Sequence, residues 1–197
     1  SQHRARIIGG CSSHNACVVL EGAPEDYDEW GPGWGYADVA PYLDRARRAL
    51  GTRTFTPEEL SPWHAAFAEA AGEDAIVHPV NADGPVRLNA AFAYLDPARG
   101  RPNLRIIGAA QVTSLIVRGK KVDGVRYRKD GNERADSADK VVLSAGVYHS
   151  PQILMLSGIG PRAELERHGI PVARALEGVG ENYQDHPVVT MTLKAKT

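Results

Sequence analysis

The chain has 197 residues, and its 23 Lys and Arg residues nearly balance its 24 Asp and Glu residues, so the formal net charge is −1. Hydrophobic residues make up 43% and charged residues 24%, which is typical of a globular protein with one domain or two small ones. The absence of a basic surplus argues against nucleic acid as a partner, and no apolar run approaches the roughly 18 residues of a membrane span. Two cysteines, Cys11 and Cys17, are too few for a disulfide scaffold, and we expect a cytoplasmic protein.

The stretch 7–20 reads IIGGCSSHNACVVL and combines two glycines with small polar residues before an apolar run. Gly9 and Gly10 free the backbone from the constraints of a Cβ atom, so this loop suits close approach to a flat ligand. A tight structural turn uses the same composition, and both interpretations stay open on these residues alone.

Helices are expected at three places in the first half of the chain. Asp38 is predicted to cap the first helix, and Ser61 precedes a proline that suits the first position of the second. Residues 72–89 are rich in turn formers and are predicted to be a loop. Residues 90–95 are predicted to form a short helix.

From residue 104 onward the apolar residues switch to the periodicity of strands. We expect strands over 104–107, 112–117 and 122–127, and the dipeptide Asp130-Gly131 predicts a tight hairpin turn into a polar return strand. Residues 140–144 contain a short, continuous apolar run, as in a strand that is covered on both faces.

A helix is predicted after this strand, with Ser150 as its N-cap, Pro151 as its first residue and Gly158 as its stop. A buried strand that runs into a glycine, here Gly146, and then into a helix is how open α/β sheets present backbone N–H groups to phosphorylated cofactors.

The last part of the chain completes the pattern. We expect a short helix between Pro161 and Gly169, a loop over 178–182 and a strand over 188–193. The order of all these elements predicts a mixed α/β (α+β) chain with an antiparallel component.

Two stretches resemble the two signatures of the glucose–methanol–choline (GMC) oxidoreductases, which are flavin-dependent alcohol oxidases and dehydrogenases. The first is 6–15, RIIGGCSSHN, and the second is 146–160, GVYHSPQILMLSGIG, where Val147 is larger than the residue that the family favours. Further blocks resemble the family in the same order: 26–30, 33–36, 61–63, 91–95, 101–104 and 178–187. The chain is therefore identified as a member of this family, and residues 10–15 resemble its choline oxidase and dehydrogenase branch.

The resemblance implies FAD as the cofactor and places nine residues near it: Gly9, Gly10, Ser13, His14, Asn15, Ala16, Cys17, Val112 and Gly146. His14 matches a histidine that the choline-oxidase-type branch bonds covalently to the 8α-methyl group of the flavin, whereas other members keep a non-covalent contact there. Both possibilities stay open. Trp30, Trp34 and Tyr36 belong to a segment that packs over the cofactor in the family, and core packing is the alternative for each.

The resemblance also implies a GMC-type fold with a Rossmann-like FAD domain and a substrate domain, here without the N-terminal βαβ unit and the C-terminal part. It divides the chain into a loop of the FAD domain (1–20), a helical lid with the start of the substrate domain (21–98), the FAD domain again (99–183) and the first strand of the substrate domain (184–197). No Gly-x-Gly-x-x-Gly motif for a dinucleotide occurs in the required context. The catalytic histidine pair of the family is expected beyond Thr197, so no catalytic residue is assigned.

The function implied by the resemblance is oxidation of a primary alcohol to an aldehyde by hydride transfer to flavin N5. The expected partners are a small alcohol, the remaining segments of the same enzyme and a second copy in a homodimer. The alternatives are a non-catalytic or truncated flavin-binding fragment and a flavin-containing lyase of the same family. His149 and His186 are expected to be structural, and the other histidines are too scattered for a metal site.

Overall fold

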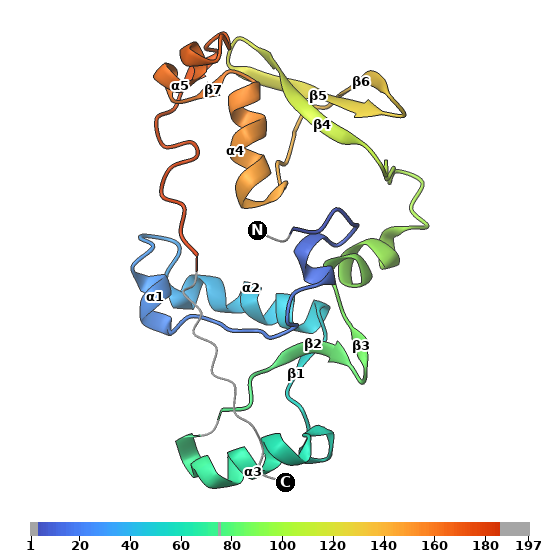
Figure 1. Cartoon of the computed structure of the whole chain (residues 1–197), viewed down its shortest axis with the longest axis vertical. Helices are drawn as coiled ribbons and strands as arrows, with labels where there is room; N and C mark the ends of the chain where they lie inside the picture. Colours follow the sequence, from blue (N-terminus) through green and yellow to red (C-terminus); the bar gives the residue numbers. More distant parts are fainter. Residues whose placement is uncertain (1–3, 75, 186–197) are drawn as a thin grey trace, which may run out of the picture. The chain divides into compact units, whose positions relative to one another are not determined.

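A computed structural model of the chain describes residues 4–74 and 76–185. The chain divides into two compact units, Ser1–Ile106 and Ile107–Thr197 (Figure 1). The described part of each unit has a three-stranded antiparallel sheet of its own, and both units also contain helices. The predicted mixed α/β class is therefore confirmed.

The first unit contains three α-helices, α1 (Pro24–Asp28), α2 (Tyr36–Ala49) and α3 (Pro62–Ala71). Its shorter 3-10 and π turns are η1 (Gly10–Ser13), η2 (Pro57–Glu59), η3 (Gly72–Asp74), η4 (Ala91–Leu95) and η5 (Asp96–Ala98). The predicted start of α3 is confirmed, because Ser61 is its N-cap and its hydroxyl accepts a hydrogen bond from the backbone N–H of His64 at 3.3 Å. The short helix predicted over 90–95 is present as the single turn η4.

Helix α2 begins three residues earlier than predicted. Its N-cap is Gly35, and the backbone N–H of Tyr36 donates to Oδ1 of Asp28 at 2.8 Å. Asp38 therefore lies inside the first turn, where a carboxylate suits the positive end of the helix dipole, and does not cap the helix. The prediction failed because the oxygen that binds the first N–H comes from a residue eight positions away.

The prediction of a loop over the whole of 72–89 is wrong. β2 (Val80–Asp83) pairs antiparallel with both β1 (Thr52–Arg53) and β3 (Val86–Arg87). Strands of two to four residues are too short to show an alternating pattern in the sequence. An isolated bridge also pairs Val18 with Val80, which attaches the segment after the amino-terminal glycines to this sheet.

The apolar side chains buried in the first unit are Tyr27, Val80, Ala82 and Ala91. The ring of Tyr27 contacts those of Trp30 and Tyr36, with centroid distances of 5.2 and 5.8 Å, and Trp34 contacts Trp30 at 6.4 Å. Trp30 and Trp34 nevertheless remain 62% and 59% exposed. The two tryptophans are therefore not core residues of this unit.

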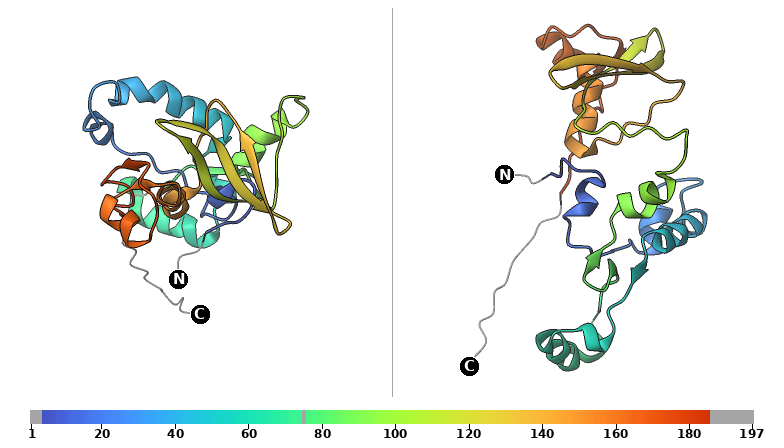
Figure 2. Two further views of the ribbon diagram at one scale, coloured as in Figure 1. Left: turned by 90° about the horizontal axis from the view of Figure 1, so that it is seen from above. Right: turned by 90° about the vertical axis from the view of Figure 1, so that its right-hand side faces the viewer.

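The second unit is built on a twisted meander of β4 (Gln111–Arg118), β5 (Lys121–Lys129) and β6 (Asn132–Ser137), seen from two further sides in Figure 2. Asp130 and Gly131 have φ angles of 53° and 77°, as a type I′ turn requires. The predicted strands over 112–117 and 122–127, the hairpin turn and the polar return strand are all confirmed.

Helix α4 (Gly146–Leu156) packs against β4, where Oγ of Ser157 accepts a hydrogen bond from the backbone N–H of Leu115 at 2.7 Å. The helix begins more than one turn before the predicted start at Pro151. Its N-cap is Ala145, and Oγ of Ser150 accepts a hydrogen bond from the backbone N–H of Ala145 at 3.1 Å. The Ser150 hydroxyl thus accepts a bond from an N–H group at the helix start, but Ser150 lies inside the helix and does not precede it.

After α4, Gly158 ends the helix as predicted, with a φ of 78°. β7 (Ile159–Gly160) and β8 (Arg174–Ala175) then form a parallel pair, and α5 (Arg162–Arg167) connects them. Leu165 of α5 is only 1% exposed and anchors this part of the unit.

Two predicted strands are not strands. Residues 104–107 and 140–144 have no strand partner among the described residues, and Val142 is 88% exposed. The prediction is wrong at both places because a strand needs a neighbour to pair with, and the local sequence does not supply that information. The strand predicted over 188–193 lies outside the described residues.

Candidate functional site

The segment Gly9–Cys17, which we call the amino-terminal loop, is the candidate site of the first unit. It contains the single turn η1, and three of its residues have left-handed backbone. The φ angle is 94° at Gly9, 58° at Gly10 and 63° at Cys17. A Cβ atom on Gly10 would meet no other atom within 4 Å. The backbone at this position is therefore open to close approach by a ligand.

Two serine hydroxyls attach this loop to the start of η4. Oγ of Ser12 donates to the carbonyl oxygen of Gly9 at 2.5 Å and accepts from the backbone N–H of Ala90 at 3.0 Å. Oγ of Ser13 donates to the carbonyl oxygen of Ile8 at 3.2 Å and accepts from Nδ2 of Asn89 at 3.1 Å. Ser13 is predicted to contact the cofactor, and in the structure its hydroxyl donates one hydrogen bond and accepts another within the protein.

The second half of the loop is held by Asn15. Its Oδ1 accepts hydrogen bonds from the backbone N–H of Cys17 at 3.1 Å and from Nη1 of Arg87 at 2.6 Å. The same arginine nitrogen lies 3.5 Å from the carbonyl oxygen of Ser12. The side-chain oxygen of Asn15 is therefore occupied, and only its backbone and amide nitrogen are available to a ligand.

His14 lies between these two anchored parts and is exposed. Its backbone N–H donates to the carbonyl oxygen of Cys11 at 3.1 Å, which fixes the residue at the end of η1. Within the described part of the chain, no hydrogen bond or ion pair engages its imidazole ring. Ala16 and Cys11 are also exposed, and Cys17 is half-buried, with both thiols free.

The remaining two predicted residues lie in the second unit. Val112 in β4 pairs with Tyr127 in β5, next to a shift in register between Val112 and Ser114. Gly146 opens α4 with a φ of 86°, and a Cβ atom there would meet nothing within 4 Å. The structure thus brings seven of the nine predicted residues together in one loop, and it places the other two on packed elements of the second unit.

Three residues of this site were missed by the sequence analysis: Ser12, Arg87 and Asn89. Ser12 lies inside the first signature, 6–15, next to Ser13, but it was not among the residues predicted to lie near the cofactor. Arg87 and Asn89 lie more than 70 residues away from the loop residues that they bind. The one signal in the sequence was that both residues lie just before 91–95, a block that resembles the family.

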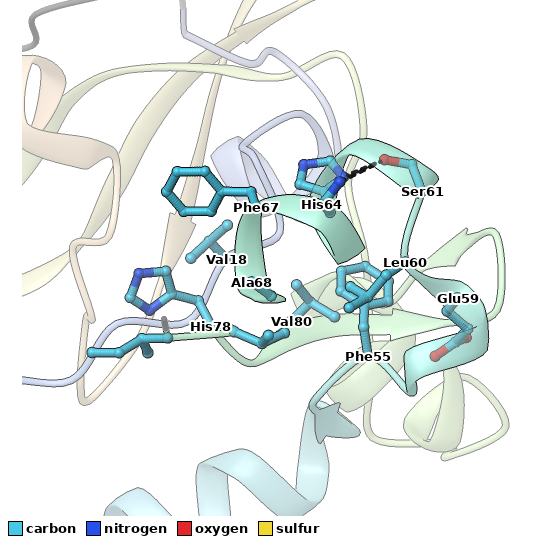
Figure 3. A pocket seen from close by; sticks show the side chains of 12 residues that line it. Val18, Phe55, Glu59, Leu60, Ser61, His64, Phe67, Ala68, His78 and Val80 are labelled. Atoms are coloured by element: carbon cyan, nitrogen blue, oxygen red, sulfur yellow. Dashed lines mark hydrogen bonds between the residues drawn. The ribbon is translucent and has the colours of Figure 1, made fainter. Parts of the chain in front are cut away.

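The first unit also contains an apolar pocket of about 470 Å³, shown in Figure 3. Its lining comes from α3, from β2 and from the segments around them: Val18, Phe55, Glu59, Leu60, Ser61, His64, Phe67, Ala68, Ile76, Val77, His78 and Val80. Oγ of Ser61 lies 2.7 Å from Nδ1 of His64, so the hydroxyl that caps α3 also contacts this ring. The pocket adjoins the end of the amino-terminal loop through the paired residues Val18 and Val80.

Glu59 is the one carboxylate of that lining, and it is paired. Nη1 and Nη2 of Arg53 donate to Oε2 and Oε1 of Glu59 at 2.6 and 2.8 Å, and the backbone N–H of Thr56 donates to Oε2 at 2.9 Å. These bonds, above all those from Arg53, lower the pKa of Glu59 to about 2. The carboxylate is therefore charged at neutral pH and already balanced by the guanidinium.

This ion pair predicts how the first unit responds to acid. Because the folded pKa of Glu59 is about 2 and the unfolded value is 4.5, its contribution to stability is complete above pH 4.5 and is lost as the pH falls toward 2. Glu59→Gln cannot titrate, so the difference in unfolding free energy between wild type and variant should shrink as the pH falls through this window. Urea unfolding followed by tryptophan fluorescence measures it, since all three tryptophans lie in the first unit. A difference that stays constant with pH would contradict the assignment.

Across residues 4–74 and 76–185, no three His, Cys, Asp or Glu side chains gather closely enough to hold a metal ion. No helix within these ranges is long and apolar enough to cross a membrane.

Comparison with known proteins points to one family. A sequence profile described as GMC oxidoreductase matches residues 2–188. The mitochondrial choline dehydrogenase of Homo sapiens is 37% identical over 214 aligned positions, which cover 93% of this chain and 36% of the relative.

Two solved structures have the same fold. Pyridoxine 4-oxidase from Mesorbium loti superimposes with a TM-score of 0.77 at 26% identity, covering 88% of this chain and 41% of that protein. An FAD-dependent oxidoreductase from Chaetomium thermophilum superimposes with a TM-score of 0.71 at 28% identity, covering 89% of this chain and 38% of that protein. This chain therefore spans between 36% and 41% of the length of these three relatives.

Proposed function

Because the chain belongs to the GMC oxidoreductase family, we propose that it is a flavin-binding part of an FAD-dependent oxidoreductase that converts a primary alcohol into an aldehyde. The observation that carries the proposal is the amino-terminal loop, in which an exposed imidazole follows an open glycine backbone. Two similar proteins are named for choline and pyridoxine, and both molecules carry a primary alcohol.

The described residues fit a large flat cofactor. Gly10 and Gly146 leave open space where a side chain would stand, so a ligand can approach the backbone at both positions. The side-chain oxygens of Ser12, Ser13 and Asn15 are engaged in hydrogen bonds within the protein. These features suit contact with the edge of a ring system.

Each residue then has a distinct part in the proposal. Gly9 and Gly10 form the thin wall of the ring site, and the backbone of 15–17 lines the ring. Val112 and Gly146 bind the adenosine portion. When bound, FAD would supply the two-electron acceptor, at N5, for the hydride of the alcohol carbon; the hydroxyl proton would pass to a base, and an aldehyde would be left. The base is proposed to be the family histidine expected beyond Thr197.

His14 is proposed to contact the ring edge, and its free ring nitrogens permit a covalent bond to the 8α-methyl group. That C–N bond would replace one methyl C–H bond and the imidazole N–H bond, and the two electrons released would reduce the flavin itself. A neutral imidazole nitrogen is a competent nucleophile when a rigid loop holds it in line. The two anchored parts of the loop on either side of His14 provide this rigidity. A non-covalent contact needs the same position but leaves the cofactor exchangeable.

The test is the colour of the full-length protein after acid precipitation. Wild-type protein is expected to be yellow, and with a covalent bond the flavin stays in the pellet and is lost from it in His14→Ala. Flavin released into the supernatant by the wild type would exclude the bond but keep the proposed cofactor. His168→Ala, which removes another exposed imidazole in the second unit, should keep wild-type colour. Protein that stays colourless after FAD is added would overturn the proposed function.

Reaction type is tested with the same preparation. Anaerobic mixing with primary alcohols should bleach the flavin of an alcohol oxidoreductase, and a lyase or non-catalytic protein would keep its colour with all of them. The cytoplasmic location and the homodimer stay predictions, which cell fractionation and light scattering of the full-length protein would check.

A further inference from the structure

We propose that Arg87 and Asn89 are positioning residues for the flavin, because they hold the amino-terminal loop in the shape that exposes His14. Arg87 and Asn89 lie 72 and 76 positions after the loop residues that they bind, and they reach the loop from β3 and from the segment that precedes η4. The inference rests on the proposed function for the flavin itself, whereas the geometry of the loop is independent of it.

Asn89 joins the loop to η4 with both ends of its amide. Its Nδ2 donates to Oγ of Ser13 at 3.1 Å, and its Oδ1 accepts from the backbone N–H of Phe92 at 3.0 Å. The adjacent backbone N–H of Ala90 donates to Oγ of Ser12 at 3.0 Å. The first half of the loop therefore cannot shift away from η4 without breaking the bonds from Asn89 and Ala90 to its two serines.

Arg87 fixes the second half. Its Nη1 donates to Oδ1 of Asn15, the residue directly after His14, at 2.6 Å. The same oxygen accepts from the backbone N–H of Cys17, so the arginine stabilises the turn that returns the chain to the sheet at Val18. A hydrogen bond from a charged donor is stronger than one between neutral groups, which makes this the main anchor of the turn.

The position of Arg87 is itself well defined. It is half-buried and lies in β3, where it pairs with Ala82 of β2. None of the carboxylates in the described ranges forms an ion pair with it. The guanidinium is therefore committed to oxygens of the loop, and the loop takes its position from the sheet.

The experiment combines hydrogen exchange with flavin content in the full-length protein. Arg87→Met and Asn89→Leu remove the bonds at similar side-chain size, and Arg87→Lys keeps a charged donor. Arg99→Met is the control, since the guanidinium of Arg99 pairs with Asp96. Exchange of the loop amides is expected to rise about fivefold to tenfold in Arg87→Met, chiefly at Cys17, and to stay unchanged in Arg99→Met. Asn89→Leu should speed exchange in the loop and at Phe92 together.

The flavin supplies the second readout. Arg87→Met should retain less flavin than wild type and show a shifted visible spectrum, and Arg87→Lys should recover most of both. Loop exchange equal to that of Arg99→Met in both Arg87→Met and Asn89→Leu would overturn the inference. So would wild-type flavin content in both variants, or a failure of Arg87→Lys to improve on Arg87→Met. If wild type holds no flavin while Arg87→Met still speeds loop exchange, the proposed function fails and the anchoring of the loop stands.

Discussion

Gly158→Ala is expected to lower the free energy of unfolding of the second unit by about 3 kcal/mol. The φ of Gly158 is 78°, a conformation that costs an alanine roughly 1 kcal/mol. An added Cβ atom would also lie 2.3 Å from the carbonyl oxygen of Pro171 and 3.0 Å from the backbone nitrogen of Ala173. Both are backbone atoms, so no side-chain rotation relieves the contact.

To relieve this contact, the chain around residue 171 has to move away from residue 158, and that movement breaks further hydrogen bonds. The carbonyl oxygen of Gly158 accepts from the backbone N–H groups of Ala173 and Arg174 at 2.9 and 3.0 Å, which aligns β8 with β7. We therefore expect a loss of about 15 °C in unfolding temperature, measured by circular dichroism, for a unit of this size.

Gly169→Ala is the control for the backbone conformation alone. Its φ is 66°, and a Cβ atom there would meet nothing within 4 Å. This variant should lose only about 1 kcal/mol. Equal losses in the two variants would show that the close approach to Pro171 is not the cause.

The helix stop at Gly158 was predictable from the sequence because it is a local feature. The same holds for the cap at Ser61 and for the hairpin at Asp130-Gly131, where the residues that define the turn are neighbours in the chain. Features that depend on distant partners were missed. Asp28 replaces Asp38 at the start of α2, and the runs 104–107 and 140–144 lack the neighbour that would make them strands.

In the candidate site, too, local features were predictable and features that depend on distant residues were not. From the residues alone, Gly9 and Gly10 indicated an open backbone, but the FAD site as a whole came from the resemblance to a family. Neither source revealed Arg87 and Asn89, because their role depends on a sheet that places residue 87 beside residue 15. Ser13 was assigned to the cofactor, and the structure shows its hydroxyl bound to the protein on both sides.

Gly9→Ala is expected to have the largest effect on the cofactor. The φ of Gly9 is 94°, and an added Cβ atom would lie 2.6 Å from Oγ of Ser13 and 3.2 Å from Cγ of Asn89. Those two side chains are bonded to each other, and Asn89 is also bonded to Phe92, so they cannot turn away freely. The strained backbone and one lost hydrogen bond together disfavour the native loop by about 2 kcal/mol.

That loss acts directly on affinity for the flavin, because a ligand that binds only the native loop loses affinity in proportion to the fraction of protein in that shape. A cost of about 2 kcal/mol raises the dissociation constant for FAD by at most roughly thirtyfold, the limit reached when the native loop is no longer the dominant shape of the flavin-free protein. Titration of flavin-free protein with FAD, followed by flavin fluorescence, measures the change. Gly10→Ala, with a φ of 58° and open space around the new Cβ atom, separates the causes in unfolding experiments, where it should lose about half as much stability as Gly9→Ala. If the two variants are equally stable, crowding against Ser13 and Asn89 does not control the shape of the loop.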